Sequence, residues 1–130
     1  MNLVDEWMTP NPTTVSHDMP LIKALKLIET RKVKQLPVIN TKTKKLVGMV
    51  TAHALRTKGI MKTFPTLPVT LAMRRNPPTV KPTTRLEEAV ALLEREQASA
   101  LPVVEKGRLV GILSATDVMP LIDREAALAY

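Results

Sequence analysis

Apolar residues recur along this chain with two different spacings, which together outline two sets of elements. In 21–28 and 86–93 they fall every three or four residues, which predicts two amphipathic helices. After each helix, two short apolar runs are separated by a polar turn, at 41–45 or 106–108, which predicts a hairpin. Each hairpin ends on a hydroxyl residue, Thr51 or Ser114, that is suited to cap a short final helix.

The two sets are copies of one unit. At a shift of 65 residues, 8–15 aligns with 73–80 and Leu36-Pro37-Val38 aligns with Leu101-Pro102-Val103. After a turn that is two residues shorter in the second copy, Leu46–Ala52 aligns with Leu109–Ala115 at a shift of 63. Such self-similarity predicts a duplicated structural unit.

Each copy has the order β-α-β-β-α, so the predicted fold class is α+β. We divide the chain into a first repeat over 8–56, a connector over 57–70 and a second repeat over 71–120. A three-stranded sheet with helices on one side leaves its other face uncovered, so we expect the two pseudo-symmetric repeats to pack through their sheets into one module.

The starts of the two long helices are also marked. Asp18 or Pro20 is suited to begin the first helix. Thr84 with Glu87 three residues later predicts a capping box at the start of the second.

Composition limits the class of protein. With 130 residues, 45% of them hydrophobic, the chain is long enough to form a core. It has no cysteine, no run of eighteen apolar residues and no basic, apolar leader at its N-terminus. We therefore expect a soluble cytoplasmic protein with no membrane segment.

The net charge of +7 lies entirely in the first half. Residues 1–65 hold eleven Lys or Arg against four Asp or Glu, and residues 66–130 hold eight of each. This excess indicates either attraction of phosphate, on nucleic acid or on a nucleotide, or simply a solvated helix face and a basic turn. With one Trp, one Tyr and one Phe, the chain has no aromatic platform for single-stranded nucleic acid, which makes nucleic acid an unfavoured partner.

Three features together resemble the tandem CBS-domain pair, or Bateman module. They are the Met-x-x-Asn-Pro-x-Thr-Val segments at 8–15 and 73–80, the two Leu-Pro-Val strands, and the run Gly111-Ile112-Leu113-Ser114-Ala115-Thr116-Asp117-Val118. The similarity extends from about Met8 to Val118. It implies a stand-alone regulatory module that is not an enzyme, forms a homodimer, and senses energy state or a metabolite on behalf of a partner protein.

Ser114 and Asp117 carry the candidate chemistry. A hydroxyl at a helix start suits a phosphate, and a carboxylate can accept hydrogen bonds from both hydroxyls of a ribose. The residues alone favour the simpler interpretation, in which the two form only a capping box. The resemblance implies a nucleotide site in which Asp117 binds the ribose and Ser114 and Thr116 bind phosphate.

The resemblance also assigns residues of the first copy to this site. It implies that Thr13, Thr14 and Gln35 line the adenine cleft and that Lys34 and His53 contact phosphate. Lys34 could instead be an exposed lysine at a helix end, and His53 a lone surface histidine. The second, related site would be weak or empty, because Ala54 stands where the other copy has Asp117; its residues would be Thr51, Ala54, Thr79, Ser99 and Ala100.

The expected ligand is AMP, ADP or ATP, with no metal, no cofactor and no catalytic residue. Two other interpretations remain open: a module that binds S-adenosylmethionine, and a ligand-free dimerisation module that buries the helices at 51–56 and 114–121. An enzyme is the least favoured, because the two histidines are far apart and there is neither a cysteine nor a phosphate loop.

Overall fold

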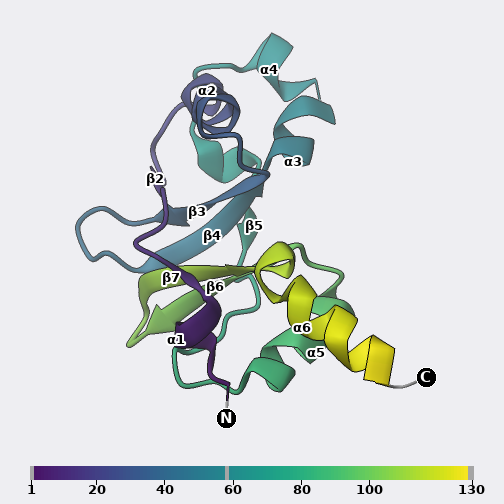
Figure 1. Ribbon diagram of the computed structural model, residues 1–130. Helices are drawn as coiled ribbons and strands as arrows, with labels where there is room; N and C mark the ends of the chain where they lie inside the picture. The colour runs from purple at the N-terminus through teal and green to yellow at the C-terminus, as the bar shows by residue number, and fades with distance from the viewer. Residues whose placement is uncertain (1, 58, 129–130) are drawn as a thin grey trace. The chain divides into compact units, whose positions relative to one another are not determined.

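The computed structural model describes residues 2–57 and 59–128, and it divides into two compact units. Unit 1 combines residues 1–12 with 78–130, and unit 2 is Thr13–Pro77. Each unit contains one sheet together with helices (Figure 1). The predicted α+β class is therefore confirmed.

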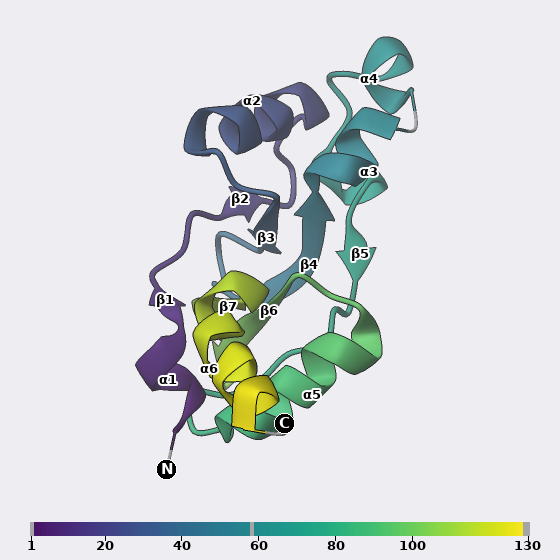
Figure 2. The same cartoon turned by 45° about the vertical axis from the view of Figure 1, so that its right-hand side comes forward.

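Unit 2 has the predicted element order. Its elements are β2 (Val15–Ser16), α2 (Leu21–Arg31), β3 (Gln35–Ile39), β4 (Leu46–Thr51), α3 (Ala52–Thr57), α4 (Ile60–Thr63), the 3-10 turn η1 (Val69–Leu71) and β5 (Arg74–Arg75). The sheet has the strand order β2-β3-β4-β5, with β2 parallel to β3 and the other pairs antiparallel. Helices α2 and α3 lie side by side (Figure 2).

Unit 1 repeats this plan. Its elements are α1 (Val4–Trp7), β1 (Thr9–Pro10), α5 (Leu86–Glu96), β6 (Ala100–Glu105), β7 (Arg108–Ser114) and α6 (Ala115–Leu128). The sheet has the order β1-β7-β6, with both pairs antiparallel. Val80 forms a parallel bridge to Val103, which corresponds to the pairing of β2 with β3.

The duplication extends to irregular details of the backbone. Helices α2 and α5 both end on a left-handed residue, Lys32 and Gln97. The hairpins of both units contain a register shift at equivalent positions, between Val38 and Ile39 and between Val103 and Val104. Because these irregularities recur at equivalent positions, they are features of the duplicated unit and not of one copy.

The leading segments of the two repeats are exchanged between the units. Strand β1, from the first repeat, pairs with β7, while β5, from the second repeat, pairs with β4. The close approach needs glycine: an added Cβ on Gly48 would lie 2.7 Å from the carbonyl oxygen of Arg74, and one on Gly111 would lie 3.0 Å from that of Thr9. Sequence similarity and spatial contact therefore divide the chain differently at these segments.

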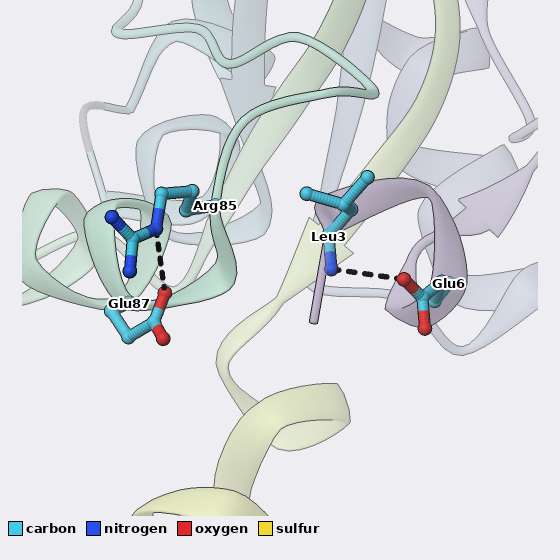
Figure 3. A network of polar contacts seen from close by, with 4 residues as sticks. All are labelled: Leu3, Glu6, Arg85 and Glu87. Atoms are coloured by element: carbon cyan, nitrogen blue, oxygen red, sulfur yellow. Dashed lines mark hydrogen bonds and ion pairs between the residues drawn. The ribbon is translucent and has the colours of Figure 1, made fainter. Parts of the chain in front are cut away.

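The N-terminal residues are attached to unit 1 beside the start of α5. The Leu3 N–H donates to Glu6 Oε1 at 3.2 Å, and close by the Arg85 side chain lies 3.7 Å from that of Glu87 (Figure 3). Backbone bonds join the two segments, with the Leu86 N–H donating to the Asn2 carbonyl at 3.0 Å. The N-terminal segment is thus part of the unit that carries the second repeat.

Each unit has its own core, and the helical spacing found in the sequence predicts the residues that fill it. Helix α2 buries Leu21, Ala24 and Ile28, and α5 buries the equivalent Leu86, Ala89 and Leu93. The first strand of each hairpin adds a fully buried leucine, Leu36 or Leu101. Burial of apolar area at roughly 25 cal/mol per Å² is the main stabilising contribution in both.

The helix starts were predicted with mixed success. Pro20 is the N-cap of α2, as expected. The capping box at Thr84 and Glu87 was a wrong prediction, because α5 begins one residue later with Arg85 as its N-cap and no side-chain cap. Thr84 Oγ1 instead accepts the Lys81 N–H at 2.9 Å, which closes the turn before the helix.

The connector contains structure that the sequence pattern did not indicate. It holds α4 and, at its C-terminal edge, η1. Both are too short for a hydrophobic period to develop. Residue 58 of the expected connector lies outside the described residues.

Candidate functional site

A reciprocal capping box forms where β7 passes into α6. The Asp117 N–H donates to Ser114 Oγ at 3.2 Å, and the Ser114 N–H donates to Asp117 Oδ2 at 3.0 Å. Strand β7 fixes the position of Ser114, and Asp117 follows in the first turn of the helix. The carboxylate at the positive end of the helix is also favoured by the helix dipole. The capping interpretation of these two residues thus describes a real local role.

The box leaves polar groups that a ligand could use. Among the described residues, no group is bonded to Asp117 Oδ1. Ser114 Oγ also lies 2.8 Å from Thr116 Oγ1, and the Thr116 side chain is exposed. The Ala115 N–H donates to the Ser99 carbonyl at 2.8 Å, so the first turn presents fewer free N–H groups than a bare helix start would. One carboxylate oxygen and two coupled hydroxyls remain for an external partner.

The equivalent junction between β4 and α3 carries only half of this arrangement. The Ala54 N–H donates to Thr51 Oγ1 at 3.0 Å, as the Asp117 N–H does to Ser114. The Ala52 N–H donates to the Lys34 carbonyl at 2.8 Å, which matches the bond from Ala115 to Ser99. The Ala54 side chain has no acceptor, so no return bond to Thr51 can form. The two junctions share a backbone but differ in chemistry.

The first-copy residues expected in the site gather at one end of the unit 2 sheet. Gln35 begins β3 directly opposite Thr51, and Lys34 precedes it with an exposed side chain. His53 is exposed in the first turn of α3. Because β2 runs parallel to β3, Thr13 and Thr14 precede β2 at the same end of the sheet.

Unit 1 gathers the corresponding residues in the same way. Ala100 lies opposite Ser114 in the hairpin register, and Ser99 precedes Ala100. Thr79 precedes Val80, whose bridge partner is Val103 of β6. The structure therefore brings together two sets, one in each unit. The assignment of Thr13, Thr14, Lys34, Gln35 and His53 to the same ligand as Asp117 stays a prediction.

Two features are absent from residues 2–57 and 59–128: a group of metal-binding side chains and a membrane-spanning helix. No three His, Cys, Asp or Glu side chains in these ranges are grouped in a way that could hold a metal ion. No helix there has both the length and the apolar character needed to cross a bilayer.

Two carbonyls that hold the final helices were missed by the sequence analysis. Those of Lys34 and Ser99 each accept the first N–H of the helix that follows the hairpin. Backbone acceptors leave no mark in residue type, so only the repeat alignment, in which these positions coincide, could have suggested an equivalent role.

Comparison with known proteins decides the family. The model of the CBS domain matches the chain twice, over residues 4–59 and 67–124. The chain belongs to the CBS domain family. The two matches correspond to the two repeats, so it contains a tandem pair.

Among solved structures, the pair is similar to CBSX2 in complex with AMP. The identity is 32%, the alignment covers 97% of this chain and 99% of the other, and the TM-score is 0.82. A structure of CBSX2 from Arabidopsis thaliana is 28% identical, and an acetoin utilization protein from Vibrio cholerae is 27% identical, each with a TM-score of 0.82. These CBS-pair neighbours share the α+β fold along nearly the whole chain.

Curated relatives place such pairs in different contexts. A CBS domain-containing protein of Dictyostelium discoideum is 28% identical and is covered over 90% of its length. An A-adding tRNA nucleotidyltransferase of Aquifex aeolicus is also 28% identical, but this chain spans only 14% of its length. An inosine-5'-monophosphate dehydrogenase of Thermoplasma acidophilum is 33% identical, with 21% of its length spanned. This chain therefore matches only a small part of each of the two enzymes.

Proposed function

We propose that this CBS pair is a non-catalytic regulatory module that binds AMP, ADP or ATP and reports it to a partner protein. The observation that carries the proposal is the Ser114–Asp117 junction, where two hydroxyls lie beside a carboxylate whose Oδ1 accepts no bond from the described part of the chain. The similarity to CBSX2, whose structure contains AMP, supports it. The partner and the sensing of energy state or a metabolite belong to the same proposal.

The chemistry of the junction matches a ribose phosphate. The Asp117 carboxylate accepts hydrogen bonds from the ribose hydroxyls, using Oδ1 and the second lone pair of Oδ2. The hydroxyls of Ser114 and Thr116 donate to phosphate at the positive end of α6. We further propose that Lys34 and His53 contact phosphate and that Thr13, Thr14 and Gln35 contact adenine.

The equivalent junction of the other unit binds weakly or not at all. Thr51 keeps the hydroxyl of Ser114, but Ala54 has no acceptor for a ribose. Thr79, Ser99 and Ala100 are the second-repeat residues that we assign to that degenerate site.

Isothermal titration with AMP, ADP, ATP and S-adenosylmethionine tests the proposal. We expect heat from at least one adenine nucleotide and a loss of affinity of at least tenfold in Asp117→Ala, because a hydrogen bond to a charged group contributes about 1.5–3 kcal/mol. Asp117→Asn, which keeps one acceptor for the Ser114 N–H but loses the charge, should weaken binding with little change in folding.

Thr84→Ala is the matched control. Like Asp117→Ala, it removes the side-chain acceptor of one backbone N–H in the same unit. That N–H belongs to Lys81, in the turn before α5 and not in the β7–α6 junction. Its nucleotide affinity should equal that of the wild type. The absence of heat with every nucleotide, or equal affinity in Asp117→Ala and the wild type, would contradict the proposal. If only S-adenosylmethionine gave heat, the ligand of the module would be S-adenosylmethionine and not a nucleotide.

A dimerisation module is the second candidate, and the exposed apolar side chains favour it. Phe64 and Leu71, between α4 and β5, are 50% and 54% exposed, and Met119 of α6 is 43% exposed. Side chains of this kind are enriched at interfaces between proteins. A homodimer predicts a concentration-dependent sedimentation coefficient, and a monomer at every concentration would contradict it.

A further inference from the structure

Each unit carries a shallow groove along the helix that precedes its hairpin, α2 or α5, and the two grooves are equivalent. The unit 2 groove has a volume of about 460 Å³ and follows α2, which Figure 2 shows lengthwise. The unit 1 groove, of about 520 Å³, follows α5. At the repeat shift of 65, Met19, Lys23, Lys26, Leu27 and Thr30 of the first align with Thr84, Glu88, Ala91, Leu92 and Arg95 of the second. The groove is therefore a feature of the repeat.

The charge of the groove differs between the copies. The α2 groove is lined by Lys23, Lys26 and Arg31, and none of its described lining residues is acidic. In the α5 groove, Glu88 stands in place of Lys23 and Ala91 in place of Lys26, which leaves a mixed lining. Part of the positive excess of the first half of the sequence is thus concentrated on one helix face.

The arrangement of the α2 groove combines a charged rim with an apolar floor. Positions 23, 26, 27, 30 and 31 follow each other at helical spacing, so they form one stripe on α2. Leu27 of this stripe and Met19, which precedes the helix, are partly buried, while the three cations are exposed. Among the described residues, none of these cations forms an ion pair; the acidic Glu29 of α2 lies 3.9 Å from Arg56 instead.

We propose that the α2 groove docks an acidic amphipathic segment of a partner protein. Carboxylates of such a segment meet the cations of the rim, and its apolar side chains cover Met19 and Leu27. Nucleic acid would satisfy only the cations, because the lining residues that the structure describes include no aromatic side chain on which a base could stack. The proposal does not depend on nucleotide binding, since the groove shares no residue with the Ser114–Asp117 junction.

The test measures binding of a fluorescein-labelled synthetic helical peptide of 16 residues, with Glu on one face and Leu on the other. Fluorescence polarisation is recorded in 50 mM NaCl without nucleotide. The groove variant Lys23→Glu with Lys26→Ala inserts the residues that the equivalent α5 positions already contain, so we expect it to fold. The control, Lys42→Glu with Lys45→Ala, makes the same charge change on the exposed hairpin turn of the same unit.

We expect the groove variant to bind the acidic peptide at least tenfold more weakly and the control variant to stay within twofold of the wild type. Equal losses in both variants would overturn the proposal, because they indicate attraction by the general positive field. No binding of the peptide by the wild type would also overturn it. Tighter binding of a 16-base-pair duplex DNA, or of phosphatidylserine vesicles, with loss in the groove variant would replace the protein partner by that class.

Discussion

The junction between β7 and α6 and the junction between β4 and α3 have the same backbone and different chemistry. In both, a hydroxyl at the end of the strand accepts the N–H three residues later, and the first helical N–H donates to a carbonyl of the neighbouring strand segment. Only the first has a carboxylate, Asp117, which returns a bond to Ser114 and whose Oδ1 accepts no bond from the residues that the structure describes. Under the proposed function, both copies of the scaffold contribute stability while one copy alone binds the nucleotide.

If the two scaffolds are equivalent, their cores should respond equally to the same cavity. Leu36→Ala and Leu101→Ala each truncate a leucine that is 1% or less exposed in the first strand of a hairpin. We expect each to lower the free energy of unfolding by about 2–5 kcal/mol. Urea denaturation followed by circular dichroism measures this, and a near-wild-type stability for one of the pair would break the comparison.

We expect smaller and unequal losses of stability when alanine replaces Gly48 or Gly111, the glycines that lie against the exchanged strands. In Gly48→Ala the new Cβ meets a backbone oxygen at 2.7 Å, while in Gly111→Ala the tightest contact, at 2.5 Å, is the flexible Met8 side chain. Overpacking costs about 1–3 kcal/mol, and we expect Gly48→Ala to be the more destabilised because its backbone neighbour cannot rotate away. The same denaturation experiment ranks the two variants, and the reverse order would contradict this explanation.

Removal of the capping hydroxyls should lower the free energy of unfolding by less than the glycine substitutions do. Ser114→Ala and Thr51→Ala each lose the acceptor for one N–H in the first helical turn, which costs about 0.5–2 kcal/mol. The pair should lose similar stability, but only Ser114→Ala should weaken nucleotide binding. Thermal unfolding with and without AMP separates the two effects. An equal loss of AMP affinity in Thr51→Ala would mean that the junctions are not functionally distinct.

The smallest expected change in the free energy of unfolding is an increase. Ala54→Asp supplies the missing carboxylate to the first turn of α3, where it can accept the Thr51 N–H as Asp117 accepts that of Ser114. We expect an increase of about 0.3–1 kcal/mol in the free energy of unfolding, which falls as salt is added. A loss of stability would show that the β4–α3 junction differs in backbone and not only in side chain.

The sequence predicted the repeated elements well because their signals are local and strong. Helical spacing identified most of the buried residues of α2 and α5, and the polar turns identified both hairpins. It did not predict the start of α5, because Thr84 is used by the preceding turn. The exchange of β1 and β5 was also missed, since two-residue strands have no detectable period.

The candidate site was predicted less completely than the fold. Ser114 and Asp117 were found because a hydroxyl and a carboxylate three residues apart at a strand end form a local motif. The capping box considered for these two residues already includes the bond to Asp117 Oδ2. The bond that occupies the Ala115 N–H could not be foreseen, because it depends on the register of the hairpin. These bonds decide how many donors and acceptors remain for a ligand.

The most direct test of the unequal junctions is a two-dimensional amide NMR titration of the wild-type protein with AMP. Each junction has assignable amides at equivalent positions, so a single experiment compares them under identical conditions. We predict saturable chemical-shift changes at Ser114, Thr116 and Asp117, and clearly smaller changes at Thr51 and Ala54. Equal changes at both junctions, or changes that spare Ser114–Asp117, would contradict the account.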